Sequence, residues 1–91
     1  MGKLRQMVVT QGVQRLGIQP LRLQSMFQKA ESAYPEQDFL VFEPKGGKVV
    51  VSDGDGKRLD ELPHTLPEKI WIKTDDYGNR LVVTALLPSE Y

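Results

Sequence analysis

The chain has 91 residues, a length suited to one domain with a small hydrophobic core. It contains no cysteine, which excludes disulfides, thiolate metal sites and thiol nucleophiles. Twelve basic and twelve acidic side chains cancel, yet residues 1–30 carry +5 with no acidic residue and residues 31–91 carry −5, an asymmetry that indicates an anionic partner for the basic part.

Hydrophobic residues make up 40% of the chain and charged residues 26%, as in ordinary folded proteins. The N-terminus lacks the apolar run of a signal peptide. No apolar run approaches the roughly 18 residues that a membrane-spanning helix needs. We therefore expect a single cytoplasmic domain, residues 1–91, with no membrane association.

Residues 19–33 carry the clearest helical pattern. Pro20 suits the first turn, where its missing N–H would have no partner, and the helix should end before Pro35. The apolar side chains recur at intervals of three and four residues and so share one face of the helix: Leu23, Met26, Phe27 and Ala30.

Residues 9–16 also have helical spacing, with apolar side chains at Val9, Val13 and Leu16. Gly17 is placed to end such a helix in the left-handed conformation. The preceding residues have strand composition, so a strand or an arm over 4–8 is the alternative that the pattern leaves open.

After Pro35 the pattern changes to strands. Residues 38–43 and 48–52 flank Gly46-Gly47, a pair that accepts the positive φ angles of a tight hairpin. Residues 69–74 and 80–87 flank a second turn rich in Asp, Gly and Asn. The sequence therefore predicts an α+β fold, in which the N-terminal helical segment packs against an antiparallel sheet of about four strands.

Within this sheet, the strand over 80–87 is almost continuously apolar, which favours a central position with both faces covered. The strand over 69–74 has lysines at its start and middle and fits a place nearer an edge. Residues 53–68, with two Asp-Gly pairs and two prolines, are expected to form a long loop.

Residues 16–23, with the sequence LGIQPLRL, place a glycine between two apolar positions and a proline at the start of a helix. On these residues, the segment 9–28 resembles the helix-turn-helix DNA-binding motif. The resemblance implies that Gly17 occupies the turn and that the helix beginning at Pro20 enters the major groove. It also implies a dimer, because such proteins usually contact two half-sites.

The resemblance assigns roles to particular side chains. Gln19, Gln24, Ser25 and Gln28, together with Leu21, would face the bases, and Arg15, Arg22 and Lys29 would contact phosphates. Lys3 and Arg5 would form a flexible basic arm. The alternative is an amphipathic helix that covers the sheet and whose polar side chains are simply solvated: Arg22, Gln24, Gln28 and Lys29.

The remaining polar residues do not form the pattern of a catalytic or metal site. The segment 53–56 has the sequence DGDG, but the ligand spacing of a calcium loop fails after its second position, so we expect a turn. His64 is the only histidine, and no serine lies in a nucleophile-elbow context. The sequence predicts no enzyme activity, no bound metal and no cofactor.

Trp71 gives a second functional hypothesis. If Ile70 and Ile72 face the core, Trp71 lies on the opposite side of its strand, where it could anchor a protein partner or a nucleic-acid base. The alternatives are that the N-terminal helix covers it or that it closes a homodimer. Two functions follow: a small nucleic-acid-binding accessory or regulatory protein, or a protein-interaction module such as an inhibitor, adaptor or immunity-type protein.

Overall fold

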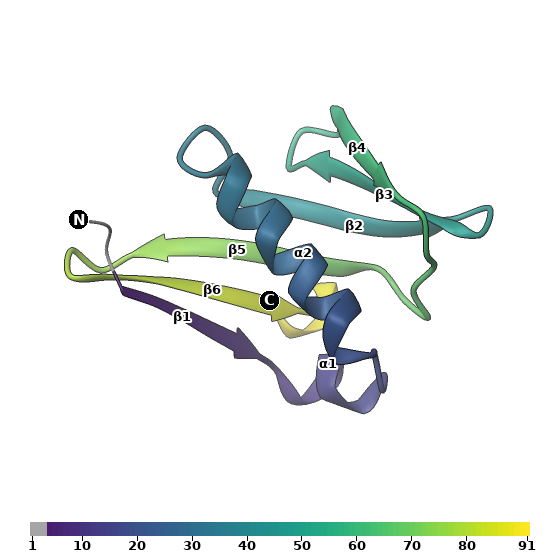
Figure 1. Ribbon diagram of the computed structural model, residues 1–91, viewed down its shortest axis with the longest axis horizontal. Helices are drawn as coiled ribbons and strands as arrows, with labels where there is room; N and C mark the ends of the chain where they lie inside the picture. The colour runs from purple at the N-terminus through teal and green to yellow at the C-terminus, as the bar shows by residue number, and fades with distance from the viewer. Residues whose placement is uncertain (1–3) are drawn as a thin grey trace.

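The computed structural model describes residues 4–91 and shows an α+β domain in which a six-stranded sheet carries a helix across one face (Figure 1). In chain order the elements are β1 (Leu4–Val9), α1 (Gln11–Arg15), α2 (Pro20–Ala33), β2 (Phe39–Lys45), β3 (Lys48–Asp53), β4 (Arg58–Leu62), β5 (Ile70–Asp76), β6 (Arg80–Leu86) and the 3-10 turn η1 (Pro88–Glu90). Two short strands lie beyond the four that the sequence predicted, one at each edge of the sheet: β4 was not expected, and β1 corresponds to the strand left open over 4–8.

The strand order across the sheet is β1-β6-β5-β2-β3-β4. Four neighbouring pairs are antiparallel, whereas β1 runs parallel to β6. The prediction of an antiparallel sheet of about four strands is therefore correct only in part, because the sheet has six strands and is mixed. The four strands that the sequence predicted form its contiguous middle.

In the N-terminal segment the observed helix is shorter than the expected one. Residues 4–9 form an edge strand because each of them pairs with β6, and only Gln11–Arg15 are helical. Thr10 begins α1, its side chain accepting a hydrogen bond from the Val13 N–H. Gly17 has φ = 66°, so it ends this helix in the left-handed conformation as expected. The expected helix over 9–16 is thus shorter, and the alternative of a strand over 4–8 is confirmed.

The expected loop over 53–68 contains β4. This strand pairs with β3, and its register shifts between Val51 and Ser52. Its sequence, RLDEL, has three charged residues among five, so it lacks the apolar pattern that indicates a strand. Pairing with β3, rather than local preference, makes it extended.

The centre of the sheet is occupied by β5 and β2 rather than by β6. Ile70 and Ile72 of β5 are buried against the helix side. The apolar run of β6 predicted a central strand. The strand is an inner one, because β1 pairs with its outer edge, but it is not at the centre of the sheet.

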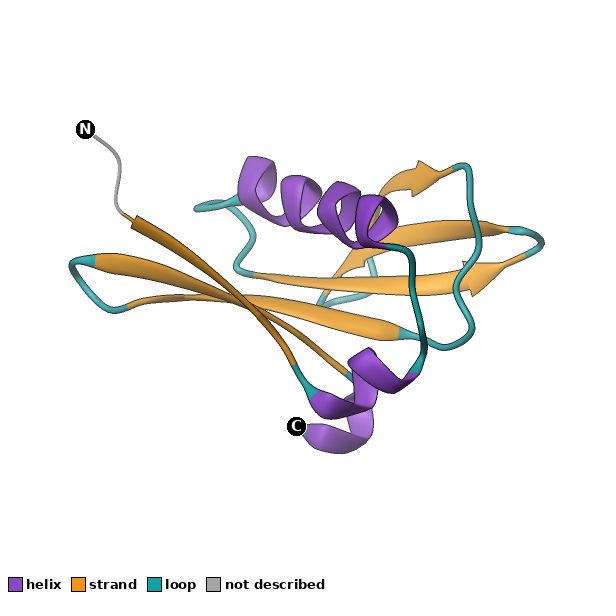
Figure 2. Ribbon diagram, turned by 60° about the horizontal axis from the view of Figure 1, so that its bottom comes forward, coloured by secondary structure: helices purple, strands orange, loops and turns teal. Residues whose placement is uncertain are grey.

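Helix α2 agrees with the prediction for residues 19–33 and provides the second layer (Figures 1 and 2). Met26, Phe27 and Ala30 are its buried residues. They pack on side chains that alternate along the strands, including Leu40, Phe42, Val49, Val51, Ile70, Ile72, Val83 and Ala85. Among residues 4–91, no helix is both long and apolar enough to cross a bilayer.

Candidate binding surfaces

The residues assigned to DNA contact lie on α1 and α2, and most of them are exposed. Arg15, Arg22, Gln24 and Gln28 are exposed, as is Gln19, which precedes α2 and makes no side-chain cap. Ser25 and Lys29 are half-buried on the flank of α2 that faces β4, where they line a hollow beside Leu62. Of the seven residues, Arg15 lies on α1, Gln19 precedes α2, and the other five lie on α2, with Ser25 and Lys29 on its flank toward β4.

The surroundings of α2 differ from those that the helix-turn-helix resemblance implied. The preceding helix α1 has only five residues and follows an edge strand. The apolar side of α2 rests on the sheet through Met26, Phe27 and Ala30. The described part of the chain thus holds α2 by sheet packing and by one short helical turn.

The opposite charges of the two parts of the sequence meet in the folded protein. Arg5 of β1 lies 2.8 Å from the Glu31 carboxylate on α2, so it belongs to a strand and not to a flexible arm. Lys29 forms an ion pair with Asp60 of β4. Lys3, the other residue of the expected arm, lies outside the described residues. Two of the five basic residues of 1–30, Arg5 and Lys29, are therefore paired with acidic residues of the rest of the chain.

Glu90, near the C-terminus, is another acidic residue that contacts the N-terminal segment. Its carboxylate accepts hydrogen bonds from the Thr10 hydroxyl (2.7 Å), the Leu87 N–H (2.8 Å) and the Gly12 N–H (3.1 Å). These bonds, the Thr10 hydroxyl first, lower the pKa of Glu90, and the nearby charge of Arg15 adds to the effect. Glu90 therefore fastens the C-terminal turn to the junction of β1 and α1.

The sheet face opposite α2 carries an aromatic cluster, which consists of Phe39, Trp71 and Tyr91. The Phe39 and Trp71 ring centroids are 5.2 Å apart, the Trp71 and Tyr91 centroids are 5.7 Å apart, and both contacts are edge-to-face. Trp71 is half-buried and Tyr91 is 78% exposed. The orientation predicted for Trp71 is confirmed, and α2 does not cover it.

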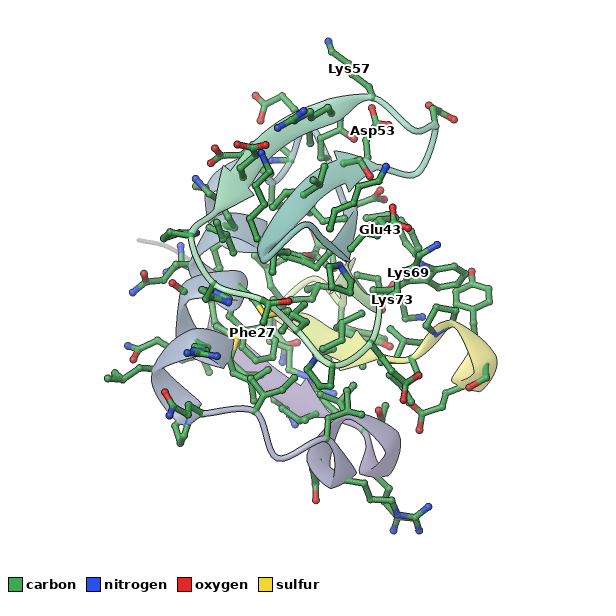
Figure 3. All side chains as sticks on the ribbon, turned by 90° about the vertical axis from the view of Figure 1, so that its right-hand side faces the viewer. Phe27, Glu43, Asp53, Lys57, Lys69 and Lys73 are labelled. Atoms are coloured by element: carbon green, nitrogen blue, oxygen red, sulfur yellow. The ribbon has the colours of Figure 1, made fainter. Side chains whose placement is uncertain are left out.

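Charged side chains surround the aromatic cluster. The Lys73 ammonium lies 5.6 Å from the Tyr91 ring centroid and 3.6 Å from Asp75. Lys69 lies 3.7 Å from Glu43. Figure 3 shows Glu43, Lys69 and Lys73 on this side of the sheet and Phe27 on the other, beneath α2. The rim of the cluster therefore has balanced charge.

A groove of about 410 Å³ runs between α2 and β1 on the helix side of the sheet. Met7 of β1 forms one wall, and Leu23 and Phe27 of α2 form the other. Gln24, Gln28 and Glu31 also line it. Local sequence patterns do not predict this groove, because its two walls come from elements that are brought together by the order of strands in the sheet.

Two further residues, Phe39 and Glu90, were not predicted to have a role, although the sequence pattern around Phe39 contains information about its position. Phe39 alternates with the buried Leu40, so its place beside Trp71 follows once β2 and β5 are neighbours. Glu90 gave no signal, because a charged residue near a chain end is ordinary. Its partners lie about eighty positions away in the sequence.

The segment 53–56 forms the expected turn. Asp53 is buried, and its carboxylate oxygen Oδ1 accepts hydrogen bonds from the Asp55 N–H (2.9 Å) and the Lys57 N–H (2.8 Å). This bonding pattern stabilises a tight turn. Across residues 4–91, no three His, Cys, Asp or Glu side chains gather in a metal-binding arrangement.

Comparison with known proteins supports the fold alone. No family model matches the chain, and no curated protein matches it. A crystal structure of a protein of unknown function from Enterococcus faecalis is similar, with a TM-score of 0.62 and 23% sequence identity. The match covers 96% of this chain and 91% of that one, so the two share their architecture over nearly the whole domain.

Proposed function

We propose that this protein is a non-catalytic protein-interaction module that binds its partner through the aromatic cluster. The observation that carries the proposal is the contact of Trp71 with Phe39 and Tyr91 on the sheet face that α2 leaves open. Large aromatic side chains held by their neighbours are frequent anchors of protein interfaces, because they bury much apolar area at little cost in conformational entropy.

The charges around the cluster favour a protein partner over a polyanion. Lys69 and Lys73 each lie within 4 Å of a carboxylate, so neither offers an unpaired positive charge to a phosphate. The edge-to-face geometry also turns the rings toward one another, which reduces the flat ring surface on which a base would stack. A partner surface with an apolar centre and a mixed polar rim fits this arrangement.

Affinity capture from cell lysate tests the proposal when it compares matched tyrosine variants. Tyr91→Ala removes the exposed ring of the cluster, whereas Tyr77→Ala removes a comparably exposed ring, at 61%, from the turn between β5 and β6. We expect Tyr91→Ala to reduce recovery of a defined partner at least about tenfold, as for a loss of about 1.4 kcal/mol of binding, and Tyr77→Ala to leave it unchanged.

Trp71→Leu gives a second comparison, with circular dichroism to confirm that the variant folds. It should lose the same partner, because leucine cannot reproduce the edge-to-face contacts. Equal recovery by Tyr91→Ala, Tyr77→Ala and the parent protein would show that the aromatic cluster is not the binding surface.

A nucleic-acid-binding role is the second candidate. The observation in its favour is the exposed side of α2, where Arg22 lies near Gln24 and Gln28 in sequence, and Arg22 has no acidic group within ion-pair distance among residues 4–91. Phosphate contacts make affinity fall steeply as salt rises. The roles of Gln19, Ser25 and Arg15 in DNA contact, and a homodimer, remain part of this candidate.

A titration against duplex DNA at low salt, with Arg22→Ala and Lys57→Ala compared, separates the two functions. Nucleic-acid binding through α2 predicts that Arg22→Ala weakens the complex and Lys57→Ala does not. Absence of binding at low salt excludes this second candidate.

A further inference from the structure

The strand β1 is the less protected edge of the sheet. It pairs with β6 on one side only, it contains no proline and a single charged residue, Arg5, and Leu4 and Met7 are 77% and 42% exposed. The opposite edge, β4, is protected by a register shift and by ion pairs of Glu61 with Lys48 and Arg58. Proteins usually shield edge strands by such means, so the contrast identifies β1 as the edge available for pairing.

The hydrogen bonds around β1 show which backbone groups point outward. The Thr10 N–H donates to the Ala85 carbonyl of β6 (3.1 Å), while Val9 stands opposite Ala85 in the register. The Val9 carbonyl accepts a hydrogen bond from Gln14 Nε2 (2.9 Å) instead. Because backbone groups alternate along a strand, the N–H and C=O groups of Arg5 and Met7 also point away from β6.

The same residues connect this edge to the groove beneath α2. Met7 stands opposite the buried Val83, so its side chain lies on the helix side, where it faces Leu23 and Phe27. A strand added along β1 would direct every second side chain to the helix side of the sheet, and those nearest Met7 would lie at this groove of about 410 Å³. The free hydrogen-bonding groups and the apolar walls are therefore parts of one site.

We infer that this site binds an extended segment of another protein, which pairs antiparallel with β1 and inserts uncharged apolar side chains into the groove. Main-chain hydrogen bonds and pockets for alternate side chains are the two components of peptide recognition by strand addition. The antiparallel direction follows from the slightly greater stability of antiparallel pairing.

The charges of the groove specify the chemistry of the peptide. Its charged groups are Glu31 and the adjoining Arg5, which pair with each other at 2.8 Å, so a charged side chain in the groove would lack a counter-ion. A second copy of the chain matches the groove less well than an apolar peptide. Antiparallel pairing of two β1 strands through their outward groups sets the charged Arg5 of one copy opposite Arg5, Met7 or Val9 of the other.

The test uses eight-residue peptides in which threonine alternates with leucine, isoleucine, methionine or phenylalanine. Amide hydrogen exchange followed by NMR reports directly on the edge. We expect at least one peptide to bind and to slow exchange of the Arg5 and Met7 amides at least about tenfold, because these N–H groups become hydrogen-bonded. A peptide with lysine at the apolar positions should not bind.

Variants of the protein test the groove. Met7→Gln should weaken peptide binding at least about tenfold, or about 1.4 kcal/mol. Leu21→Gln is the matched control, since Leu21 is 79% exposed on α2 and does not line the groove. Tyr91→Ala should also bind normally, which separates this site from the aromatic cluster.

Methylated peptides test the pairing itself. In an antiparallel pair, residues opposite each other share a face, so the apolar residues opposite Met7 and Arg5 direct their N–H groups to β1. Methylation of those nitrogens should abolish binding, and methylation of the threonine nitrogens should not. The inference is overturned if no peptide binds at about 1 mM, an affinity limit of about 4 kcal/mol. It is also overturned by equal effects of the two methylations, or by amide protection that rises with protein concentration alone.

Discussion

Glu90 joins the two ends of the domain through a single side chain. Its carboxylate contacts the Thr10 hydroxyl and the Gly12 N–H at the start of α1, and the Leu87 N–H of its own turn. A Cβ atom on Gly12 would lie 2.7 Å from this carboxylate, so glycine leaves room for the contact. The residue therefore links β1, α1 and η1 although it lies on the surface.

Replacing Glu90 by glutamine should lower the melting temperature at neutral pH. Hydrogen bonds to the carboxylate lower the pKa of Glu90 in the folded state, so protonation favours the unfolded state. The stabilisation is present above the pKa that this group has in the unfolded chain and is lost as the pH falls through the lower folded value. Thermal unfolding of the parent and of Glu90→Gln from pH 7 to pH 3 measures this.

The difference in melting temperature between the two proteins should shrink as the pH falls. Glu68→Gln is the control, an exposed carboxylate in the segment before β5, and its melting temperature should stay within about 3 °C of the parent. A constant difference across the pH range would contradict the role assigned to the Glu90 charge.

At the scale of the elements, α2 is stable because one of its sides is buried against the sheet. Met26 has no exposed surface, whereas Leu21, five positions earlier, is 79% exposed. Met26→Ala should reduce the free energy of unfolding by about 2–5 kcal/mol, because it leaves a cavity in the core. Leu21→Ala should change it by no more than about 0.5 kcal/mol. Urea unfolding of both variants measures the difference, and similar midpoints would argue against the observed orientation of α2.

The alternation of backbone groups along β1 gives a prediction for proline substitutions. The Gln6 N–H points toward β6, as the Thr10 N–H does, while the Met7 N–H points to solvent. Proline is tolerated on an edge strand only where the lost N–H faces solvent. Gln6→Pro should therefore destabilise the protein by about 1–3 kcal/mol more than Met7→Pro, because it leaves a carbonyl of β6 unpaired. Equal unfolding midpoints in urea would show that the strand is turned differently.

At the scale of the whole molecule, ion pairs connect the basic N-terminal part with the acidic remainder. Arg5 pairs with Glu31, and Lys29 pairs with Asp60. Both pairs are partly exposed, so each contributes modestly. Their consequence is that two of the five basic charges of residues 1–30 are paired within the chain, whereas Arg15 and Arg22 remain exposed.

A double-mutant cycle on Lys29→Ala and Asp60→Ala measures this connection. Since the side chains are 37% and 43% exposed, we expect a coupling energy of about 0.5 kcal/mol at low salt. Screening should remove most of it at 1 M salt. Lys57→Ala with Asp60→Ala serves as the control cycle and should show no coupling. A Lys29–Asp60 coupling that persists in 1 M salt would mean that the contact is not mainly electrostatic.

Local patterns predicted much of the domain. The periodicity of residues 19–33 and the start at Pro20 correspond to α2, and four apolar runs correspond to β2, β3, β5 and β6. Gly46 and Gly47 have φ angles of 57° and 81°, as the tight hairpin required. These features depend on neighbouring residues, so the sequence alone was sufficient for them.

Among the candidate binding residues, some positions could be predicted from local patterns and others could not. The alternation of Ile70, Trp71 and Ile72 was enough to predict which side of β5 Trp71 occupies. The helix-turn-helix resemblance instead relied on a local pattern around Gly17, and that pattern does not contain the information that residues 4–9 pair with β6. A β-strand acquires its partners through the tertiary fold, so the helical spacing of Val9, Val13 and Leu16 predicts a longer helix than the observed Gln11–Arg15.

The sequence by itself determined the α+β class, the helix α2, four inner strands and the glycines of the turns, because each depends on local spacing or backbone freedom. Only the tertiary structure decided that β1 and β4 complete the sheet, that Phe39 and Tyr91 join Trp71, and that Glu90 fastens the C-terminal turn to the segment after β1. It also decided that Met7 and α2 enclose a groove beside a free strand edge. Each of these contacts joins residues that are distant in the chain, and such pairings are set by sheet order and register.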